Sequence, residues 1–270
     1  MVNEEIVPAG RAGLQVADMS IQRAYALFDF FKTLDDRPVF LKEHLDRFFR
    51  SAERMRLEIG LTEPELRERI DGLLKKNALS DSGVRLTLTG GYATDAYSIA
   101  HPNLVISQTP LVSTPGEQLP AAIRLVSYPH VRQMPDVKTI DYLMAIWLQP
   151  WVQAQEANDV LYQQNCVCSE CPRSNIFMVT GSDELVTPSR NILQGVIRGK
   201  VLQLGRRLFP VEERDVTLDE LYAAKEVFVT STSKHIWPVV EVDRRKIGSG
   251  VAGPVAQVLN KELYRLVKEA

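Results

Sequence analysis

The sequence predicts an α+β fold divided into two regions. Short runs rich in β-branched or aromatic residues interleave with segments in which apolar residues recur every three to four positions, without a strict strand–helix–strand order. A segment with three prolines and one glycine, residues 110–120, separates two patterned regions and cannot sustain a helix or a central strand. We therefore expect a small α+β domain over residues 1–112, a linker over 113–121 and a large α+β domain over 122–270.

The first region predicts a small mixed domain. Asp35-Asp36-Arg37 separates two apolar runs, which predicts a hairpin turn. From about His44, apolar residues recur at helical spacing and predict an amphipathic helix. Thr62-Glu63-Pro64-Glu65 is typical of a capping box that begins a second helix, with proline near the first turn. Strands are expected over residues 26–32, 38–41, 84–89 and 103–108.

The second region is richer in strands. Thr217-Leu218-Asp219-Glu220 is another capping box, and Pro150 predicts a kink within a helix over 142–157. Further helices are expected over residues 195–208, 217–224 and 254–267. Strands are expected over residues 122–128, 160–164, 175–179, 184–187 and 227–230.

The composition excludes several classes of protein. The 270 residues include 32 Lys+Arg and 34 Asp+Glu, so the net charge of −2 provides no basic field for nucleic acid. No apolar run reaches the roughly 18 residues of a membrane helix, and the acidic start predicts no signal peptide. Cys166, Cys168 and Cys171 form an odd set, which argues against a secreted disulfide framework. We therefore expect a cytoplasmic enzyme without a nucleic-acid or membrane partner.

Lys138 and Glu170 each have two interpretations. Lys138 lies between an apolar residue and an expected helix start, where a lysine is either a solvated surface residue or a Schiff-base lysine with an accessible neutral amine. Glu170 precedes a polar turn, where it either solvates the loop or supplies the fixed carboxylate that a pyridinium nitrogen needs.

Two further segments suit a phosphate group. The turn at Gly195 leads into a helix, and the unpaired amides at a helix N-terminus can hold a phosphate while glycine permits close approach. The run from Thr230 to Ser233 places four hydroxyls directly after a strand. A plain turn explains either segment equally well.

These four motifs, in this order, resemble the class IV aminotransferases of pyridoxal-phosphate fold type IV. That family includes D-amino-acid transaminases, branched-chain aminotransferases and aminodeoxychorismate lyase. Residues 28–32 and 43–52 look like the N-terminal signature of the family, and residues 229–243 are similar to the tail of D-amino-acid transaminases. The resemblance implies a two-domain fold of the D-amino-acid aminotransferase type, with pyridoxal 5'-phosphate as cofactor.

The resemblance implies a role for each matching residue. Lys138 matches the lysine that forms the Schiff base and shuttles the substrate proton, Glu170 the partner of the pyridine nitrogen, and Arg47 the phosphate-binding arginine. The other implied cofactor contacts are Tyr142 near the phenolate oxygen, Ser174 and Asn175 at the turn that supports the cofactor, and Gly195, Val196, Ile197, Ser231 and Thr232 around the phosphate.

The family also implies ping-pong transfer of an amino group between an amino acid and a 2-keto acid. It implies a homodimer in which the partner's small domain completes each site. Because Arg47 lies in the first region while Lys138 and Glu170 lie in the second, a single site needs both regions.

The substrate-binding residues depart from the familiar subfamilies. Branched-chain enzymes carry Tyr-x-Arg on the strand that here contains Arg85 without the tyrosine, and D-amino-acid transaminases carry an Arg-x-His that the following loop lacks. A substrate α-carboxylate still needs cationic or amide donors. We expect Arg23 and Arg85 to hold it in a variant D-amino-acid transaminase. Phe28, Lys32 and Ser233 complete the expected substrate-binding set.

Alternative functions stay open at this point. They are a branched-chain L-amino-acid aminotransferase, an aminodeoxychorismate lyase, and a binding protein that keeps the fold without catalysis. The three cysteines lack a fourth ligand nearby, so no metal site is expected.

Overall fold

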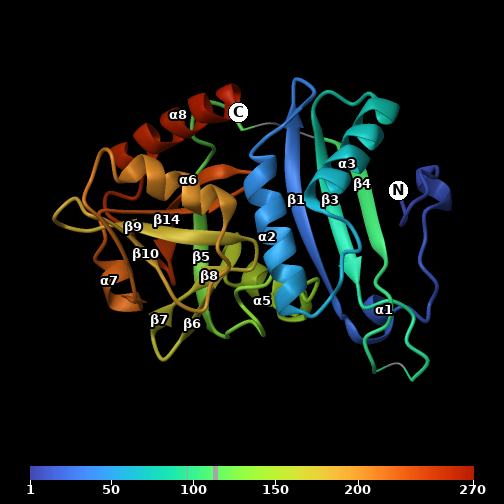
Figure 1. Cartoon of the computed structure of the whole chain (residues 1–270). Coiled ribbons are helices and arrows are strands. Elements are labelled where there is room, and N and C mark those ends of the chain that lie inside the picture. Colours follow the sequence, from blue (N-terminus) through green and yellow to red (C-terminus); the bar gives the residue numbers. More distant parts are fainter. Residues whose placement is uncertain (96, 112–114) are drawn as a thin grey trace. The chain divides into compact units, whose positions relative to one another are not determined.

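The computed structural model describes residues 1–95, 97–111 and 115–270 of the chain (Figure 1). They gather into two compact units, of which the first contains residues 1–95, 97–111, 137–141 and 270, and the second contains residues 115–136 and 142–269. Residues 112–114, where the expected linker begins, lie outside the described residues.

The segment that carries Lys138 packs with the first unit, whereas the sequence had assigned this lysine to the second region. Backbone hydrogen bonds explain the difference, because the Phe28 amide donates to the Lys138 carbonyl at 2.8 Å and the Ile140 amide donates to the Ala26 carbonyl at 3.1 Å. Val137 is also buried in the core of the first unit. Nothing in the local sequence pattern of 137–141 encodes this long-range pairing.

The first unit is built on a four-stranded antiparallel sheet in the order β2-β1-β3-β4. Its strands are β1 (Ala26–Leu34), β2 (Arg37–Pro38), β3 (Ser82–Thr89) and β4 (Leu104–Pro110). Asp35 and Asp36 both have positive φ and join β1 to β2 in a two-residue turn, as a type I′ hairpin requires. The expected hairpin is therefore confirmed, although its second strand is shorter than expected.

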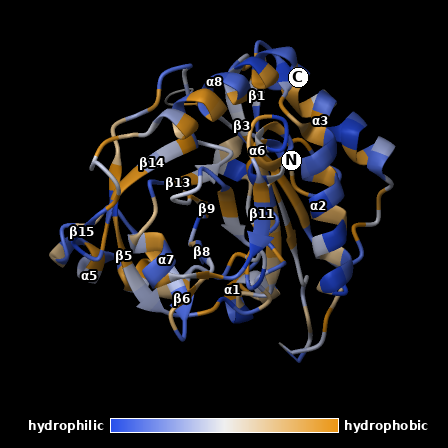
Figure 2. Ribbon diagram, turned by 90° about the vertical axis from the view of Figure 1, so that its left-hand side faces the viewer, coloured by the Kyte–Doolittle hydropathy of each residue, from blue (hydrophilic) through white to orange (hydrophobic). Residues whose placement is uncertain are grey.

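Helices α2 (Leu41–Arg54) and α3 (Glu63–Asn77) cover one face of this sheet (Figure 1). Helix α2 begins three residues before His44 because Phe40, at φ 53°, turns the chain into the helix directly after β2. Leu45 and Phe48 of α2 are fully buried in the core, and Figure 2 shows both polar and apolar residues along this helix. The expected capping box at Thr62 is confirmed at the start of α3. The short elements η1 (Ala9–Arg11) and α1 (Met19–Arg23) precede the sheet.

In the described residues, the second unit contains an 11-stranded mixed sheet whose main path runs β11-β10-β9-β13-β14-β5-β6-β7-β12. Strands β10 and β12, from opposite parts of this path, contact each other, so the sheet curls into a partly closed barrel. The strands are β5 (Ile123–Pro129), β6 (Asp159–Gln164), β7 (Val167–Cys168), β8 (Glu170–Cys171), β9 (Ser174–Val179), β10 (Leu185–Pro188), β11 (Val211–Arg214), β12 (Val216–Thr217), β13 (Glu226–Ser231), β14 (His235–Val242) and β15 (Arg245–Lys246).

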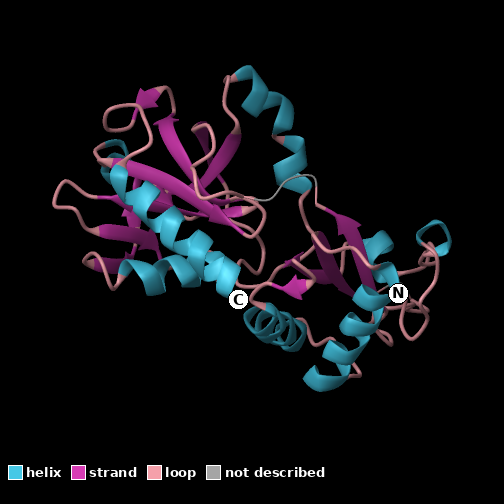
Figure 3. Cartoon of the chain, turned by 90° about the horizontal axis from the view of Figure 1, so that it is seen from above, coloured by secondary structure: helices cyan, strands magenta, loops and turns pink. Residues whose placement is uncertain are grey.

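One expected helix of the second unit is divided into two shorter helices. The helix expected over 142–157 is two helices, α4 (Leu143–Trp147) and α5 (Gln149–Ala154), because Pro150 lies in the first turn of α5 and cannot continue the ladder of hydrogen bonds from α4. Helix α7 (Leu218–Tyr222) begins with the expected capping box. Helices α6 (Val196–Gly205) and α8 (Pro254–Glu269) pack against each other and against β13. Helix α8 leads to the C-terminus marked in Figure 3. In the described part of the chain, no helix is long and apolar enough to cross a membrane.

The start of α8 is fixed by a buried carboxylate. Glu226 on β13 accepts hydrogen bonds from the Val255 and Ala256 amides, both at 3.0 Å, so it satisfies two donors at the positive end of the helix. Gly253 precedes the helix, and a methyl group at this position would collide with the Glu226 carboxylate. Glycine therefore permits the close approach that anchors α8 to β13.

We predict that Glu226→Ala lowers the free energy of unfolding by about 3 kcal/mol, because two charge-assisted hydrogen bonds to buried amides are lost. Urea denaturation followed by far-UV circular dichroism measures the change. Glu262→Ala on the same helix is the control, since it removes only an exposed pair with Arg265 and should cost less than about 1 kcal/mol. Equal costs for the two variants would contradict this account of the helix start.

Candidate active site

Glu170 is the centre of a buried polar cluster in the second unit. It lies on the two-residue strand β8, and its side chain is 5% exposed. Its Oε1 accepts from Arg132 Nε at 2.8 Å, and its Oε2 accepts from the Leu193 amide at 2.8 Å. Asn175 Nδ2 lies 3.4 Å from the same Oε2. Both oxygens are therefore held by donors that match an ionised carboxylate.

Asn175 and Thr230 continue this cluster across the sheet. Asn175 on β9 is paired with Glu170 on β8 and with Thr230 on β13, so the three side chains project from one face at neighbouring positions. The Thr230 hydroxyl is buried and has no hydrogen-bond partner within the described residues. Because side chains alternate along a strand, Ser231 projects from the other face.

The N-terminus of α6 lies beside Asn175. The N-cap of the helix is Gly195, which has no side chain to cap the first-turn amides of Val196 and Ile197. Asn175 Nδ2 donates to the Leu193 carbonyl at 2.8 Å, and a methyl group on Gly195 would collide with Asn175 Oδ1. Glycine therefore lets the helix end approach the Glu170 row, where unpaired amides can bind an anion.

Arg198 stabilises the loop between β10 and α6 through hydrogen bonds. Its buried guanidinium donates to the Pro188 carbonyl at 2.9 Å, to Gln194 Oε1 at 3.0 Å and to Glu213 Oε2 at 2.8 Å. These contacts tie both ends of the loop that presents the Leu193 amide to Glu170. The polar cluster is thus supported by a second layer of hydrogen bonds.

Lys138 and Arg85 share one aromatic neighbour in the first unit. Lys138 Nζ lies 4.5 Å from the centre of the Phe28 ring, and Arg85 Cζ lies 3.8 Å from the same centre. Lys138 is half-buried and Phe28 is buried, whereas Arg85 is exposed on β3. The Phe28 ring therefore gathers an amine and a guanidinium in one place, as cation–π contacts do.

Arg47, expected to bind phosphate, is buried with Asp29 and His44. Its Nε and Nη2 donate to the two Asp29 oxygens at 2.7 and 2.8 Å, and His44 Nδ1 lies 2.7 Å from Asp29 Oδ1. Burial opposes ionisation of Asp29, but the Arg47 and His44 contacts outweigh it and hold the Asp29 pKa well below its usual value. Burial lowers the pKa of His44, although Asp29 opposes that shift. This cluster orients the Arg47 guanidinium.

The remaining expected substrate residues have different environments. Lys32 is 1% exposed on β1, and burial lowers its pKa to about 8. Arg23 is exposed at the end of α1 and donates to the Gln22 carbonyl at 2.8 Å. Ser233 is exposed in the turn between β13 and β14.

The other expected cofactor contacts lie in the second unit. Tyr142 is the half-buried N-cap of α4, and Ser174 is half-buried at the start of β9. Ser231 and Thr232 are half-buried at the end of β13 and in the turn after it.

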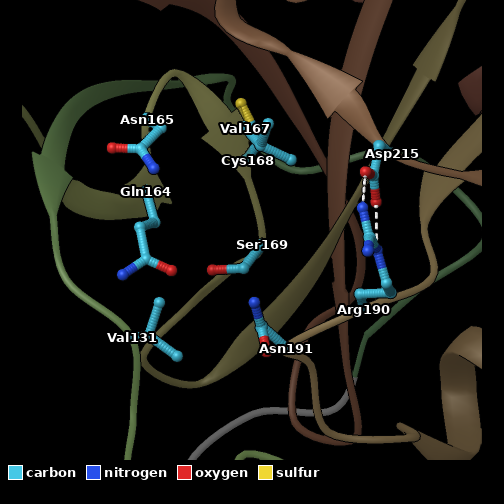
Figure 4. A pocket seen from close by; sticks show the side chains of 9 residues that line it. All are labelled: Val131, Gln164, Asn165, Val167, Cys168, Ser169, Arg190, Asn191 and Asp215. Carbon is cyan, nitrogen blue, oxygen red and sulfur yellow. Dashed lines mark hydrogen bonds and ion pairs between the residues drawn. The ribbon is translucent and has the colours of Figure 1, made fainter.

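A cavity of about 220 Å³ lies next to the Glu170 cluster (Figure 4). It contains none of the expected site residues, and an ion pair between Arg190 and Asp215 crosses its wall (Figure 4). Its lining is Val131, Gln164, Asn165, Val167, Cys168, Ser169, Arg190, Asn191 and Asp215. Ser169 and Val131 of this lining immediately precede Glu170 and Arg132 in the chain.

The three cysteines are free thiols with different exposure. Cys166 is exposed in the turn after β6, while Cys168 and Cys171 are buried. Burial raises the pKa of Cys168 to about 12 and the pKa of Cys171 well above its ordinary value, so both thiols are protonated at neutral pH.

Several residues of these clusters were absent from the expected site, among them Arg132, Thr230, Asp29 and His44. Arg132 has no spacing signal, because its contact with Glu170 depends on folding across 38 residues. Thr230 lay within the noted hydroxyl run, and strand alternation from Ser231 could have selected it. Asp29 lay within the noted N-terminal signature, and His44 lies one helical turn before Arg47, as helical partners do.

The chain is similar to known proteins of one family. The profile of the family described as "Amino-transferase class IV" matches residues 26–242. A D-alanine aminotransferase of Staphylococcus haemolyticus is 24% identical over 99% of this chain and 97% of its own length.

Two solved structures share the fold. The T.th. branched-chain amino acid aminotransferase with pyridoxamine 5'-phosphate has a TM-score of 0.89 at 24% identity, covering 100% of this chain and 94% of that chain. A putative 4-amino-4-deoxychorismate lyase from Legionella pneumophila has a TM-score of 0.85 at 21% identity, covering 96% of this chain and 97% of that chain.

The family match spans most of the chain, from the first strand of the small unit to β14 of the large one. The solved relatives share the fold over at least 96% of the chain. The chain belongs to the class IV aminotransferases and is a pyridoxal-phosphate-dependent transaminase of fold type IV.

Proposed function

We propose that this transaminase moves amino groups between D-amino acids and 2-keto acids, with Lys138 as its catalytic residue. The observation that carries the proposal is the placement of Lys138 Nζ and Arg85 over one Phe28 ring. A substrate whose carboxylate binds Arg85 would then hold its Cα near Lys138. The relation to D-alanine aminotransferases supports the preference for the D-enantiomer.

The polar residues of the second unit fit pyridoxal phosphate. Glu170 offers a fixed carboxylate for a ring nitrogen, and the uncapped N-terminus of α6 offers amides for a phosphate. The buried Thr230 hydroxyl, without a partner in the described residues, offers one more hydrogen bond to that phosphate. A buried polar atom of this kind costs free energy unless a ligand satisfies it.

Each residue then has a defined part in the reaction. When bound, pyridoxal phosphate withdraws electrons from the substrate Cα. Lys138 Nζ would hold the cofactor covalently and, once a donor amine displaces it, would take the Cα proton as general base. Glu170 would keep a fixed anion beside the ring nitrogen, and Arg47 would face the phosphate while Asp29 fixes its orientation.

Lys138→Ala is predicted to lower kcat by at least about 1,000-fold, since both the covalent attachment and the general base are lost. Borohydride treatment of the wild-type holoenzyme, followed by peptide mass mapping, should place one cofactor on Lys138. Lys200→Ala, which changes a half-buried helix lysine, is the control and should label like wild type. Label on another lysine in the wild type would contradict the assignment.

Arg85→Ala is predicted to raise the KM for a D-amino acid by roughly 10- to 100-fold, because a charge-assisted hydrogen bond to the carboxylate is lost. Arg23→Ala, which changes the second expected carboxylate ligand, is measured beside it. Half-reactions with matched D- and L-amino acids report both affinity and enantiomer preference. Unchanged apparent affinity for amino acids in both variants would contradict the proposed carboxylate site.

A branched-chain L-amino-acid aminotransferase is the main alternative, since a solved relative has that activity in its name. The absence of a tyrosine two residues before Arg85, where Gly83 stands, argues against that subfamily pattern. A preference for L-leucine over D-alanine in the same half-reactions would favour the alternative. Release of pyruvate from aminodeoxychorismate without consumption of a keto acid would instead favour a lyase.

The proposed enzyme acts as a homodimer, and an exposed apolar strip on α4 is its proposed interface. Leu143, Ile146 and Trp147 are 73%, 68% and 65% exposed, and they lie one helical turn apart or adjacent. Large apolar side chains gathered in this way mark association surfaces.

Substitution of this strip is predicted to separate the subunits. The double variant Ile146→Glu/Trp147→Glu should elute as a 30.4 kDa chain in light-scattering chromatography, where the wild type has twice that mass. Val251→Glu is the control, because Val251 is 69% exposed in a loop outside α4, and this change should leave the mass unchanged. A dimeric double variant would place the interface elsewhere.

A further inference from the structure

Arg132 connects the carboxylate of Glu170 with the chain that leads to Lys138. It follows β5 in a segment without regular structure, and its side chain is 15% exposed. Two nitrogens of Arg132 lie close to Glu170 Oε1, with Nε at 2.8 Å and Nη2 at 2.7 Å. The same Nη2 donates to the Pro135 carbonyl at 2.6 Å, and Pro135 is three residues before Lys138 in the chain.

This arrangement restricts Glu170 more than a single ion pair would. Oε1 is held by a planar guanidinium whose direction is fixed by Pro135, while Oε2 is held by the Leu193 amide. Each carboxylate oxygen has its own anchor, so rotation about the last torsion of Glu170 breaks at least one charge-assisted hydrogen bond. Lysine cannot reproduce this contact, because an ammonium lacks the planar fork of donors.

A purely structural ion pair is the competing interpretation. Buried pairs contribute little net stability against their desolvation cost, so stability alone gives weak grounds for keeping one. Arg132 contacts Glu170 Oε1, and the Leu193 amide binds the other oxygen, Oε2. This carboxylate belongs to the polar row formed by Glu170, Asn175 and Thr230. The position of Arg132 on the proposed cofactor partner therefore favours a role in the reaction over a role in folding.

We propose that Arg132 is a positioning residue that fixes the Glu170 carboxylate toward the cofactor ring nitrogen and, through Pro135, fixes the segment that leads to Lys138. The inference rests on the proposed role of Glu170. Arg132 touches neither substrate nor reacting atoms and acts through Glu170 and the backbone. Loss of the guanidinium leaves one Glu170 oxygen without its anchor, so the carboxylate no longer stays at a fixed place beside the nitrogen.

The test uses holoenzyme loaded with pyridoxal phosphate that carries ¹⁵N in the ring. The ring-nitrogen chemical shift reports its protonation and hydrogen bonding, which an ion pair with a merely structural role would not change. The variants are Arg132→Gln, Arg132→Lys and Glu170→Gln. Arg173→Gln is the matched control, because Arg173 is exposed in the turn of the same hairpin and loses the same charge.

In Arg132→Gln, the ring-nitrogen signal should move toward its position in Glu170→Gln. The kcat of Arg132→Gln should fall about 10- to 100-fold while KM changes little. Losses of this size are typical when a residue that orients a direct contact of the reacting group is removed. Arg132→Lys should recover only part of kcat and of the signal, and Arg173→Gln should match the wild type. Thermal melting of the apo-proteins shows whether each variant folds, and if Arg132→Gln does not, Arg132→Lys decides alone.

The outcomes distinguish the role of Arg132 from the role of Glu170. A wild-type signal and kcat in Arg132→Gln or Arg132→Lys, beside a shifted signal in Glu170→Gln, would overturn the positioning role alone. An unshifted signal in Glu170→Gln would overturn the role of Glu170 and the role of Arg132 together.

Discussion

The fixed carboxylate of Glu170 is the constraint on which the buried polar row of the second unit depends. Its two oxygens are held from different elements, by Arg132 before the Lys138 segment and by the Leu193 amide before α6. Asn175 joins the same row and braces the loop that leads to Gly195. Because a buried charge is costly unless hydrogen-bonded, these partners must be in place before the strand pair β8–β9 can carry an anion at all.

In the first unit, the buried charge that needs partners is the guanidinium of Arg47. Arg47 is neutralised by Asp29, and His44 completes the contact, so the guanidinium stays oriented inside a largely apolar core. On the same strand β1, the Phe28 ring contacts the side chains of Lys138 and Arg85. One strand thus contacts three basic side chains, two through an aromatic ring and one through a carboxylate.

Local sequence signals predicted the elements that depend on local chemistry. The turn at Asp35 and the capping boxes at Thr62 and Thr217 are where the sequence placed them, since each depends on residues within four positions. The pairing of 137–141 with β1 and the contact of Arg132 with Glu170 depend on residues that are distant in sequence, so no local pattern encodes them. Thr230 differs, because it lies next to Ser231 in the hydroxyl run and the alternation of side chains along β13 places the two on opposite faces.

The most direct test of the account follows the substrate Cα proton. Wild-type holoenzyme is mixed with D-alanine or L-alanine deuterated at Cα, without a keto acid, and both deuterium loss to solvent and pyruvate formation are measured. The account predicts loss of deuterium and one pyruvate per subunit from D-alanine, and much slower reaction of L-alanine. Equal or faster reaction of L-alanine, or no deuterium loss from either, would contradict it.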